Sequence, residues 1–189
     1  MDPWPPLNLI RWIWIGLGIL WLAGALMTKR AARTQPIGAR LIHTAMMLVA
    51  FLLLVQIRAG FLGWRFVPAS PASEYAGLAM VIAGAAFAAW ARLSLGSNWS
   101  GLVMVKQHHE LIQSGPYGIV RHPIYSGLML AALGTAVAIG QLGCLLGFAV
   151  AAVAWWMKWR VEERFMTERF GSRYEEYKRR VNAVIPFVF

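Results

Sequence analysis

Long apolar runs separated by short polar segments form the main pattern of the chain. Four runs reach roughly the 17 to 25 residues that a helix needs to cross a bilayer, at about residues 9–27, 39–57, 76–91 and 124–159. The last run is long enough for two passes, and only a tight hairpin fits between them at residues 139–144. The pattern therefore predicts an all-α, polytopic integral membrane protein with about five transmembrane helices.

No internal repeat or low-complexity linker divides the chain, so we expect a single membrane domain over residues 1–189. Within it, residues 1–92 form a three-helix membrane scaffold, and residues 93–189 contain the polar motifs, a helical hairpin and a C-terminal cap. The first apolar run has neither a basic segment before it nor an Ala-x-Ala-like site after it. We therefore expect it to remain as a transmembrane helix rather than to act as a cleaved signal peptide.

The charge of the chain reports its orientation. The formal net charge is +10, although only 14% of the residues are charged and 59% are hydrophobic. All but three of the 18 basic residues follow the first span, lie between the third and fourth, or follow the fifth; the three others are Arg11, Arg58 and Arg65. Because positive residues concentrate on the cytoplasmic side, we expect the N-terminus outside and the C-terminus in the cytoplasm. The basic surplus indicates headgroup contact and no nucleic-acid partner.

The ten tryptophans include several near the ends of the expected spans, namely Trp4, Trp12, Trp64, Trp99 and Trp159. Such positions match the aromatic belt at the level of the lipid headgroups. Packing inside the bundle is the alternative for each of them.

Small residues indicate where helices approach closely. Gly143 and Gly147 form a G-x-x-x-G motif on the fifth span, and Gly134 and Gly140 lie on or just after the fourth. We expect these glycines to bring the fourth and fifth helices together in an antiparallel pair.

Two short motifs predict helix starts. Ser70 or Ser73 caps the third helix, with Pro71 in its first turn. Ser172 and Glu175 form a capping box that starts a second C-terminal helix.

Metal and disulfide chemistry find little support. Cys144 is the only cysteine and lies in an apolar run, so we expect no disulfide and no thiolate metal site. His108, His109 and Glu110 are adjacent, and neighbouring side chains point to different faces. We therefore predict no metal site.

Polar residues concentrate in two segments, 96–121 and 158–184, that we place at the inner membrane surface. Because the fourth helix begins there and the fifth ends there, the two segments are expected to meet.

The first polar segment ends in the passage SGPYGIVRHPIYSG, residues 114–127. Pro123 forces the preceding residue toward an extended backbone and suits the first turn of a helix, which places His122 and Tyr125 at a helix N-terminus. The amides and the dipole there favour an anion, and Arg121 adds a two-pronged partner. The alternative is an ordinary membrane-edge turn in which Arg121 snorkels and His122 caps the helix.

Glu162 and Glu163 lie where the fifth helix leaves the bilayer. In the functional interpretation, one carboxylate turns inward and binds a cationic or donor-rich ligand, such as a sulfonium with an adenosyl group. In the alternative interpretation the pair is solvated, with Arg164 and Arg169 as neighbours.

Past residue 159 the pattern becomes amphipathic. Apolar residues recur at steps of three and four, at Met166, Phe170, Tyr174, Tyr177 and Val181. This segment either lies on the headgroups as an interfacial helix or covers a cytoplasmic pocket with its aromatic face.

The ordered motifs Arg-His-Pro-x-Tyr-x-Gly, Glu-Glu, Phe-Gly, Tyr-x-x-Tyr and a closing proline cover residues 107–187. Together they resemble the isoprenylcysteine carboxyl methyltransferase family, relatives of the phospholipid N-methyltransferases. The resemblance implies that residues 93–189 are a catalytic portion and that S-adenosylmethionine is the methyl donor, bound on the cytoplasmic side.

Carried over position by position, the resemblance implies a set of cofactor contacts, to which we add Arg121 from the passage at residues 114–127. The full set is His109, Glu110, Leu111, Ile112, Tyr117, Arg121, His122, Pro123, Ile124, Tyr125 and Glu162. Lys158 occupies the position of a substrate-binding arginine, with Arg160 close by, so Lys158, Arg160 and Glu162 are the catalytic candidates. A lysine at this position lacks the two-pronged grip of an arginine.

We expect in-line methyl transfer to a lipophilic acceptor, which is a prenylated, isoprenylcysteine carboxylate-like group, a membrane lipid or a small hydrophobic molecule. Two alternatives are a phospholipid N-methyltransferase and a non-catalytic membrane protein that binds lipid or cofactor.

Overall fold

The computed structural model describes residues 5–26, 33–34, 37–55, 59–96, 104–105 and 111–186. Within these residues the elements are α1 (Pro5–Leu26), β1 (Arg33–Thr34), α2 (Ile37–Val55), η1 (Gly60–Gly63), α3 (Pro71–Leu95), β2 (Met104–Val105), η3 (Gly115–Gly118), α4 (Pro123–Ile139), α5 (Leu142–Phe170) and α6 (Ser172–Arg180). The two short strands, which the sequence did not predict, pair with each other in antiparallel fashion.

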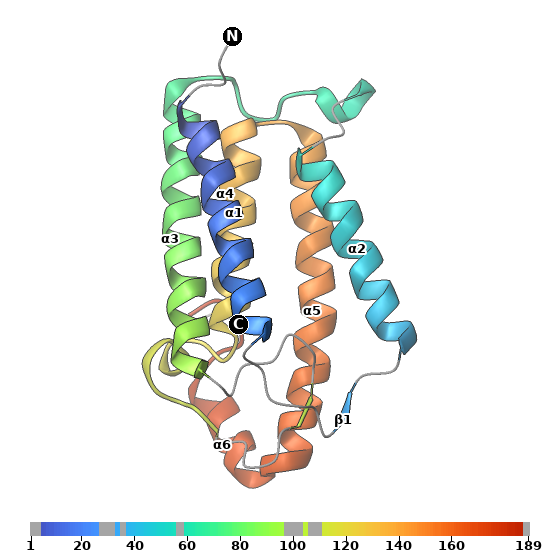
Figure 1. Cartoon of the computed structure of the whole chain (residues 1–189), viewed down its shortest axis with the longest axis vertical. Coiled ribbons are helices and arrows are strands. Elements are labelled where there is room, and N and C mark those ends of the chain that lie inside the picture. Colours follow the sequence, from blue (N-terminus) through green and yellow to red (C-terminus); the bar gives the residue numbers. More distant parts are fainter. Residues whose placement is uncertain are drawn as a thin grey trace.

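The long helices run side by side in an elongated bundle (Figure 1). In that view α3, α1 and α4 lie together on one side, and α5 and α2 on the other. The fourth helix begins, and α5 continues toward α6, at the same end of the bundle, which we name the site end. The α4–α5 connection lies at the opposite end (Figure 1), as expected for an antiparallel hairpin.

The helix lengths confirm an all-α membrane fold. Four helices, α1, α2, α3 and α5, are long and apolar enough to cross a bilayer, whereas α4 is a shorter apolar helix of 17 residues. The run at residues 124–159 divides into α4 and α5 as expected. Because α5 has 29 residues and a helix rises about 1.5 Å per residue, it is longer than the roughly 30 Å hydrocarbon core. Its last turns therefore extend beyond the membrane interior.

A seam of small residues joins α3 to α4. A methyl group at Gly77 would lie 2.5 Å from the carbonyl O of Gly134, and one at Gly127 would lie 2.5 Å from the carbonyl O of Gly84. On each helix the two glycines are seven residues, or about two turns, apart: Gly77 and Gly84 on α3, and Gly127 and Gly134 on α4. The two backbones are therefore in near contact along this seam. The hydrophobic effect contributes little to helix association in lipid, so the van der Waals contacts of such close packing stabilise the helix pair instead.

The expected glycine contact between α4 and α5 was wrong. Gly147 lies against α2, where a methyl group on it would be 2.9 Å from the carbonyl O of Ala50. Gly134 packs on α3, and Gly140 ends α4 in a left-handed conformation beside Val67. Adjacency in sequence joined α4 and α5, but it did not determine which faces of these helices carry the close contacts.

Both predicted helix starts are confirmed, α3 at Pro71 and α6 at Ser172, but only one of the two predicted caps forms. The Ser70 hydroxyl accepts from the backbone N of Ser73 at 3.2 Å, and the Ser73 hydroxyl accepts from the backbone N of Ser70 at 3.3 Å. The capping box at Ser172 was wrong, because α6 begins after Gly171 with no side-chain cap. Glu175 instead accepts from the Thr167 hydroxyl at 3.3 Å.

Candidate functional site

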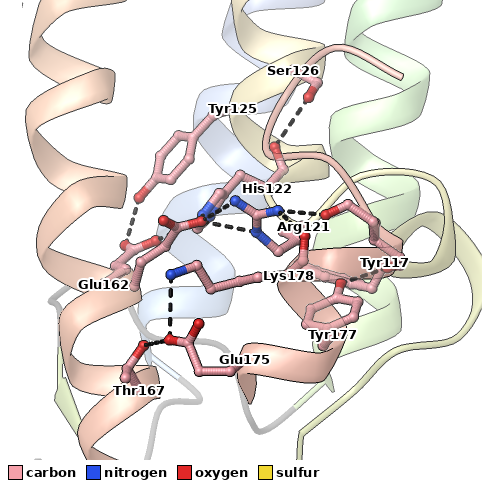
Figure 2. A network of polar contacts seen from close by, with 12 residues as sticks. Tyr117, Arg121, His122, Tyr125, Ser126, Glu162, Thr167, Glu175, Tyr177 and Lys178 are labelled. Atoms are coloured by element: carbon pink, nitrogen blue, oxygen red, sulfur yellow. Dashed lines mark hydrogen bonds and ion pairs between the residues drawn. The ribbon is translucent and has the colours of Figure 1, made fainter. Parts of the chain in front are cut away.

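Four segments that are far apart in the sequence meet at the site end, as Figure 2 shows. They are η3 with Tyr117, the N-terminus of α4 with residues 121–126, the Glu162–Glu163 pair on α5, and the segment 181–184 that follows α6. The expectation that the two polar segments of the sequence meet is thus confirmed for the described residues.

The turn before α4, which we call the elbow, consists of residues 114–122. Gly115 has a φ of +60°, a left-handed conformation that glycine adopts without strain, and it opens η3. Pro123 then occupies the first turn of α4, and the residue before it, His122, has a non-helical backbone with a φ of −123°. His122 is the N-cap residue but makes no side-chain cap, which leaves its imidazole for other partners.

The carboxylate of Glu163 holds the elbow. Its Oε1 accepts hydrogen bonds from Arg121 Nε at 2.9 Å and Nη2 at 2.7 Å, and lies 3.2 Å from His122 Nε2. The three side chains are only 11%, 13% and 8% exposed for Arg121, Glu163 and His122. Arg121 Nη1 donates to the carbonyls of Lys178 and Val181, so every guanidinium nitrogen is engaged within the protein. In this structure Arg121 is therefore bound to Glu163 and the backbone.

Glu162, the next residue, is placed differently. Its Oε1 accepts from the Tyr125 hydroxyl at 2.5 Å, and its Oε2 lies 3.7 Å from His122 Nδ1 (Figure 2). Its side chain is 26% exposed, twice the value for Glu163. Because an ionised carboxylate only accepts hydrogen bonds, His122 carries its proton on Nε2 when it binds Glu163. Glu162 Oε2 therefore keeps accepting capacity beyond its long contact with His122.

Three aromatic rings surround these carboxylates. The ring of His122 stacks on Trp159 with centroids 6.0 Å apart and an angle of 22°, and Tyr125 lies 6.2 Å from Trp159. Lys158 Nζ lies 6.0 Å from the centroid of the Tyr125 ring. Tyr125 and Trp159 also belong to an apolar cluster with Trp155 and Val184. The carboxylates thus border an apolar, aromatic wall.

Trp159 resolves one of the open alternatives for the tryptophans. It is 8% exposed and packs inside the bundle, whereas Trp12 and Trp64 are 66% and 69% exposed, as in an aromatic belt. Trp4 and Trp99 lie outside the described residues. The signal that sequence reasoning missed is spacing, because Trp159 precedes Glu163 by one turn of α5 and so shares its face.

The segment 181–184, which we call the C-terminal strap, binds the elbow through its backbone. The amides of Arg121 and His122 donate to the carbonyls of Asn182 and Ala183, each at 2.8 Å. The Ser126 hydroxyl donates to the carbonyl of Val184 at 2.5 Å. No sequence motif identified this strap, because backbone pairing leaves little trace in side-chain patterns.

The aromatic face of α6 covers the elbow. The Tyr177 hydroxyl donates to the carbonyl of Tyr117 at 2.5 Å, and the Tyr117 hydroxyl donates to the carbonyl of Ala91 on α3 at 3.4 Å. Burial raises the pKa of Tyr177 to about 12 and the pKa values of Tyr117 and Tyr174 above their usual range. All three hydroxyls therefore stay protonated at neutral pH and can donate.

The other residues expected at the site are distributed as follows. Leu111 and Ile112 are half-buried just before the elbow, Pro123 is buried, and Ile124 is half-buried in the first turn of α4. Lys158 is half-buried, and Arg160 is exposed on α5. His109 and Glu110 lie outside the described residues.

The long apolar helices define a polytopic integral membrane protein. The ion cluster of Arg121, His122 and Glu163 forms a polar site at one end of it. A family model described as phospholipid methyltransferase matches residues 72–173, more than half of the chain. The chain belongs to this family, and the match includes the elbow and the Glu162–Glu163 pair.

Similar proteins agree with the resemblance found in the sequence. The chain is 35% identical over 116 residues to protein-S-isoprenylcysteine O-methyltransferase B of Arabidopsis thaliana. The matched region covers 59% of this chain and 58% of that protein. It is 35% identical over 115 residues to protein-S-isoprenylcysteine O-methyltransferase of Xenopus laevis, covering 59% of this chain and 40% of that protein. The matches thus span little more than half, or less, of these relatives.

A solved structure shares the fold. The eukaryotic intramembrane Ras methyltransferase, isoprenylcysteine carboxyl methyltransferase, matches with a TM-score of 0.59 and 24% identity, covering 99% of this chain and 70% of that one. At this identity the likeness establishes the membrane fold.

Proposed function

We propose that this protein is a membrane methyltransferase that uses S-adenosylmethionine and methylates a lipophilic acceptor of the isoprenylcysteine carboxylate type. The observation that carries the proposal is the convergence of Tyr125 and His122 on Glu162 beside an aromatic wall. The names of the similar proteins support the reaction type. Residues 93–189 would be the catalytic portion and residues 1–92 its membrane scaffold.

The residues at the site suit a sulfonium donor. Glu162 is partly exposed, and among the described residues its Oε2 has just the long contact to His122, so it can accept hydrogen bonds from a cationic, donor-rich ligand. The rings of Tyr125 and Trp159 offer faces to a sulfonium or to adenine. The residues that would hold the donor are those listed from the resemblance, with Glu162, His122 and Tyr125 at the centre and Arg121 positioning them.

When bound, the donor would supply an electrophilic methyl group. Transfer to an acceptor carboxylate would give a methyl ester and leave a thioether, with the electron pair of the broken carbon–sulfur bond on sulfur. A carboxylate acceptor has no proton to lose, so no side chain needs to act as a base. The apolar cluster around Tyr125, Trp159 and Val184 excludes water, which favours a step in which opposite charges disappear. The contribution of the chain is then mainly positioning and desolvation.

Lys158 is our choice for the acceptor carboxylate, because it is half-buried beside the Tyr125 ring. Arg160 is exposed on the same helix, and we place it at the entrance of the site. The acceptor would arrive from the lipid phase between helices, and the donor from the aqueous phase at the site end.

The positive-inside bias supports a cytoplasmic site end and an external N-terminus. Single cysteines at exposed positions test this orientation in a Cys144→Ala background. Arg179→Cys at the site end should resist a membrane-impermeant maleimide in sealed spheroplasts, and Phe61→Cys at the opposite end should react. The reverse pattern would overturn the orientation.

Purified protein in lipid nanodiscs tests the reaction itself. We expect labelled S-adenosylmethionine to convert N-acetyl-S-farnesylcysteine to a base-labile methyl ester. Transfer of label to phosphatidylethanolamine instead would favour the phospholipid N-methyltransferase alternative, which the description of the family model supports. Binding of S-adenosylmethionine without transfer to either acceptor would favour a non-catalytic binding protein.

A further inference from the structure

A histidine on α2 faces the region of Lys158. Two contacts set the register of α2 against α5: Cys144 Sγ lies 3.4 Å from the carbonyl O of Leu54, and Gly147 lies against Ala50. The two helices run antiparallel (Figure 1), so each step toward the site end along α5 is a step toward the start of α2. Continued by two turns, this register brings His43 opposite the stretch from Trp155 to Lys158.

Lys158 lies within electrostatic range of the His43 imidazole, as this register requires. The same face of α2 also carries Met47 and Ala50, which pack in the apolar cluster with Tyr125 and Trp155. His43 therefore lies on the face of α2 that packs toward the site end of α5.

His43 has an unused hydrogen-bonding atom. Its Nε2 is buried and has no hydrogen-bond partner among the described residues. A buried polar atom without a partner is costly, and an ionisable side chain within a membrane helix is rare and is by default a candidate functional residue. His43 therefore has hydrogen-bonding capacity at Nε2 that the described part of the chain does not use.

We propose that His43 and Lys158 together bind an oxyanion carried by the lipophilic acceptor, with Lys158 supplying the positive charge and His43 a hydrogen bond from Nε2–H. The inference rests on the proposed function and deepens it by adding His43 as a residue that recognises the charged group of the acceptor. An ammonium group is a point charge with little directional preference, whereas a fixed imidazole N–H defines where the oxyanion lies. A carboxylate on a prenylcysteine and a phosphate on a phospholipid are the two sources of such an oxyanion.

The test compares binding of N-acetyl-S-farnesylcysteine and its uncharged carboxamide by calorimetry. We expect the wild-type protein to bind the acid about tenfold more tightly than the amide. In His43→Leu, which has no donor, this preference should fall to about threefold or less, with unchanged S-adenosylmethionine affinity. His43→Gln keeps an N–H near the position of Nε2 and should restore most of the preference. Thr44→Val, exposed on the same helix, serves as the control and should change nothing.

Each result decides the question. Equal binding of acid and amide by the wild-type protein, or an unchanged preference in His43→Leu, would overturn the inference. Equal losses in His43→Leu and His43→Gln would also overturn it, because the imidazole would then act through its shape. A wild-type protein that prefers the acid but transfers no methyl group would retain the binding site and refute the proposed catalysis.

A second arm distinguishes the source of the oxyanion. The same variants are tested with phosphatidylethanolamine in phosphatidylcholine vesicles, with initial transfer rates as the readout. A change in KM for farnesylcysteine alone assigns a carboxylate, and a change for the phospholipid alone assigns a phosphate. No change in KM for either acceptor would contradict the role of His43.

Discussion

The side of α4 that packs on α3 and the N-terminus of α4 are held by different kinds of interaction. Along α3, α4 is fixed by backbone contacts between glycines such as Gly84 and Gly127, with no charge involved. At the site end, its N-terminus is fixed by the ions Arg121 and Glu163 and by the carbonyls of the C-terminal strap. The seam determines where α4 lies, and the ion cluster determines how the elbow presents its side chains. A rigid scaffold therefore places a site whose details depend on charge.

The seam should be the more sensitive of the two regions. A methyl group at Gly127 would meet the Gly84 carbonyl O at 2.5 Å and the Ala88 N at 2.6 Å, which are backbone atoms that cannot rotate away. Gly127→Val should therefore destabilise the protein by more than about 3 kcal/mol and leave little folded material. Thermal unfolding in detergent measures this loss.

The matched control is Gly18→Val on α1, where no atom of the described residues outside the local helix backbone lies within 4 Å of an added methyl group. Its free energy of unfolding should lie within about 0.5 kcal/mol of the wild-type value. Similar stability for Gly127→Val would mean that α3 and α4 are not in backbone contact.

Removing the charge of Glu163 from the ion cluster should lower the free energy of unfolding by less than a substitution at Gly127 in the seam does. Glu163→Gln leaves the buried Arg121 guanidinium and His122 without their anion, so we expect a loss of about 2 kcal/mol. Glu176→Gln is the control, because Glu176 is 63% exposed and its contact with Arg180 is 4.0 Å long. Chemical denaturation monitored by tryptophan fluorescence compares the two, and equal stabilities would show that Glu163 does not hold the elbow.

The neighbouring carboxylate should affect binding rather than folding. Glu162→Ala removes a partly exposed acceptor, so we expect S-adenosylmethionine affinity to fall about tenfold or more. Its unfolding temperature should stay closer to the wild-type value than that of Glu163→Gln. Isothermal titration calorimetry gives the affinity, and an unchanged dissociation constant would remove Glu162 from the proposed donor site.

The sequence predicted the helices better than their contacts. Apolar run length identified α1, α2, α3 and the α4–α5 hairpin, because a membrane demands continuous apolar segments. The glycine motif led us to expect a close contact between α4 and α5, whereas the close seam lies between α3 and α4. Run length carries no information about which helix faces which.

The same division holds at the site. The elbow and the glutamate pair stood out as polar residues beside apolar runs, and His122 and Glu162 do meet. The sequence did not separate the roles of Glu162 and Glu163, since adjacent residues differ only in the direction of their side chains. It also missed the strap, whose bonds to Arg121 and His122 involve backbone carbonyls that every residue has.

The smallest expected effect concerns the cover over the elbow. Tyr177→Phe removes one buried hydrogen bond to the carbonyl of Tyr117 and should cost about 1 kcal/mol. The pKa of Tyr177 is raised to about 12, above its usual value near 10 in an unfolded chain, so its stabilisation is complete below pH 10 and is lost as the pH rises toward 12. Unfolding curves at pH 8 and pH 11 should therefore differ more for the wild-type protein than for Tyr177→Phe. Equal pH dependence in the two proteins would show that the Tyr177 hydroxyl is not buried against the elbow.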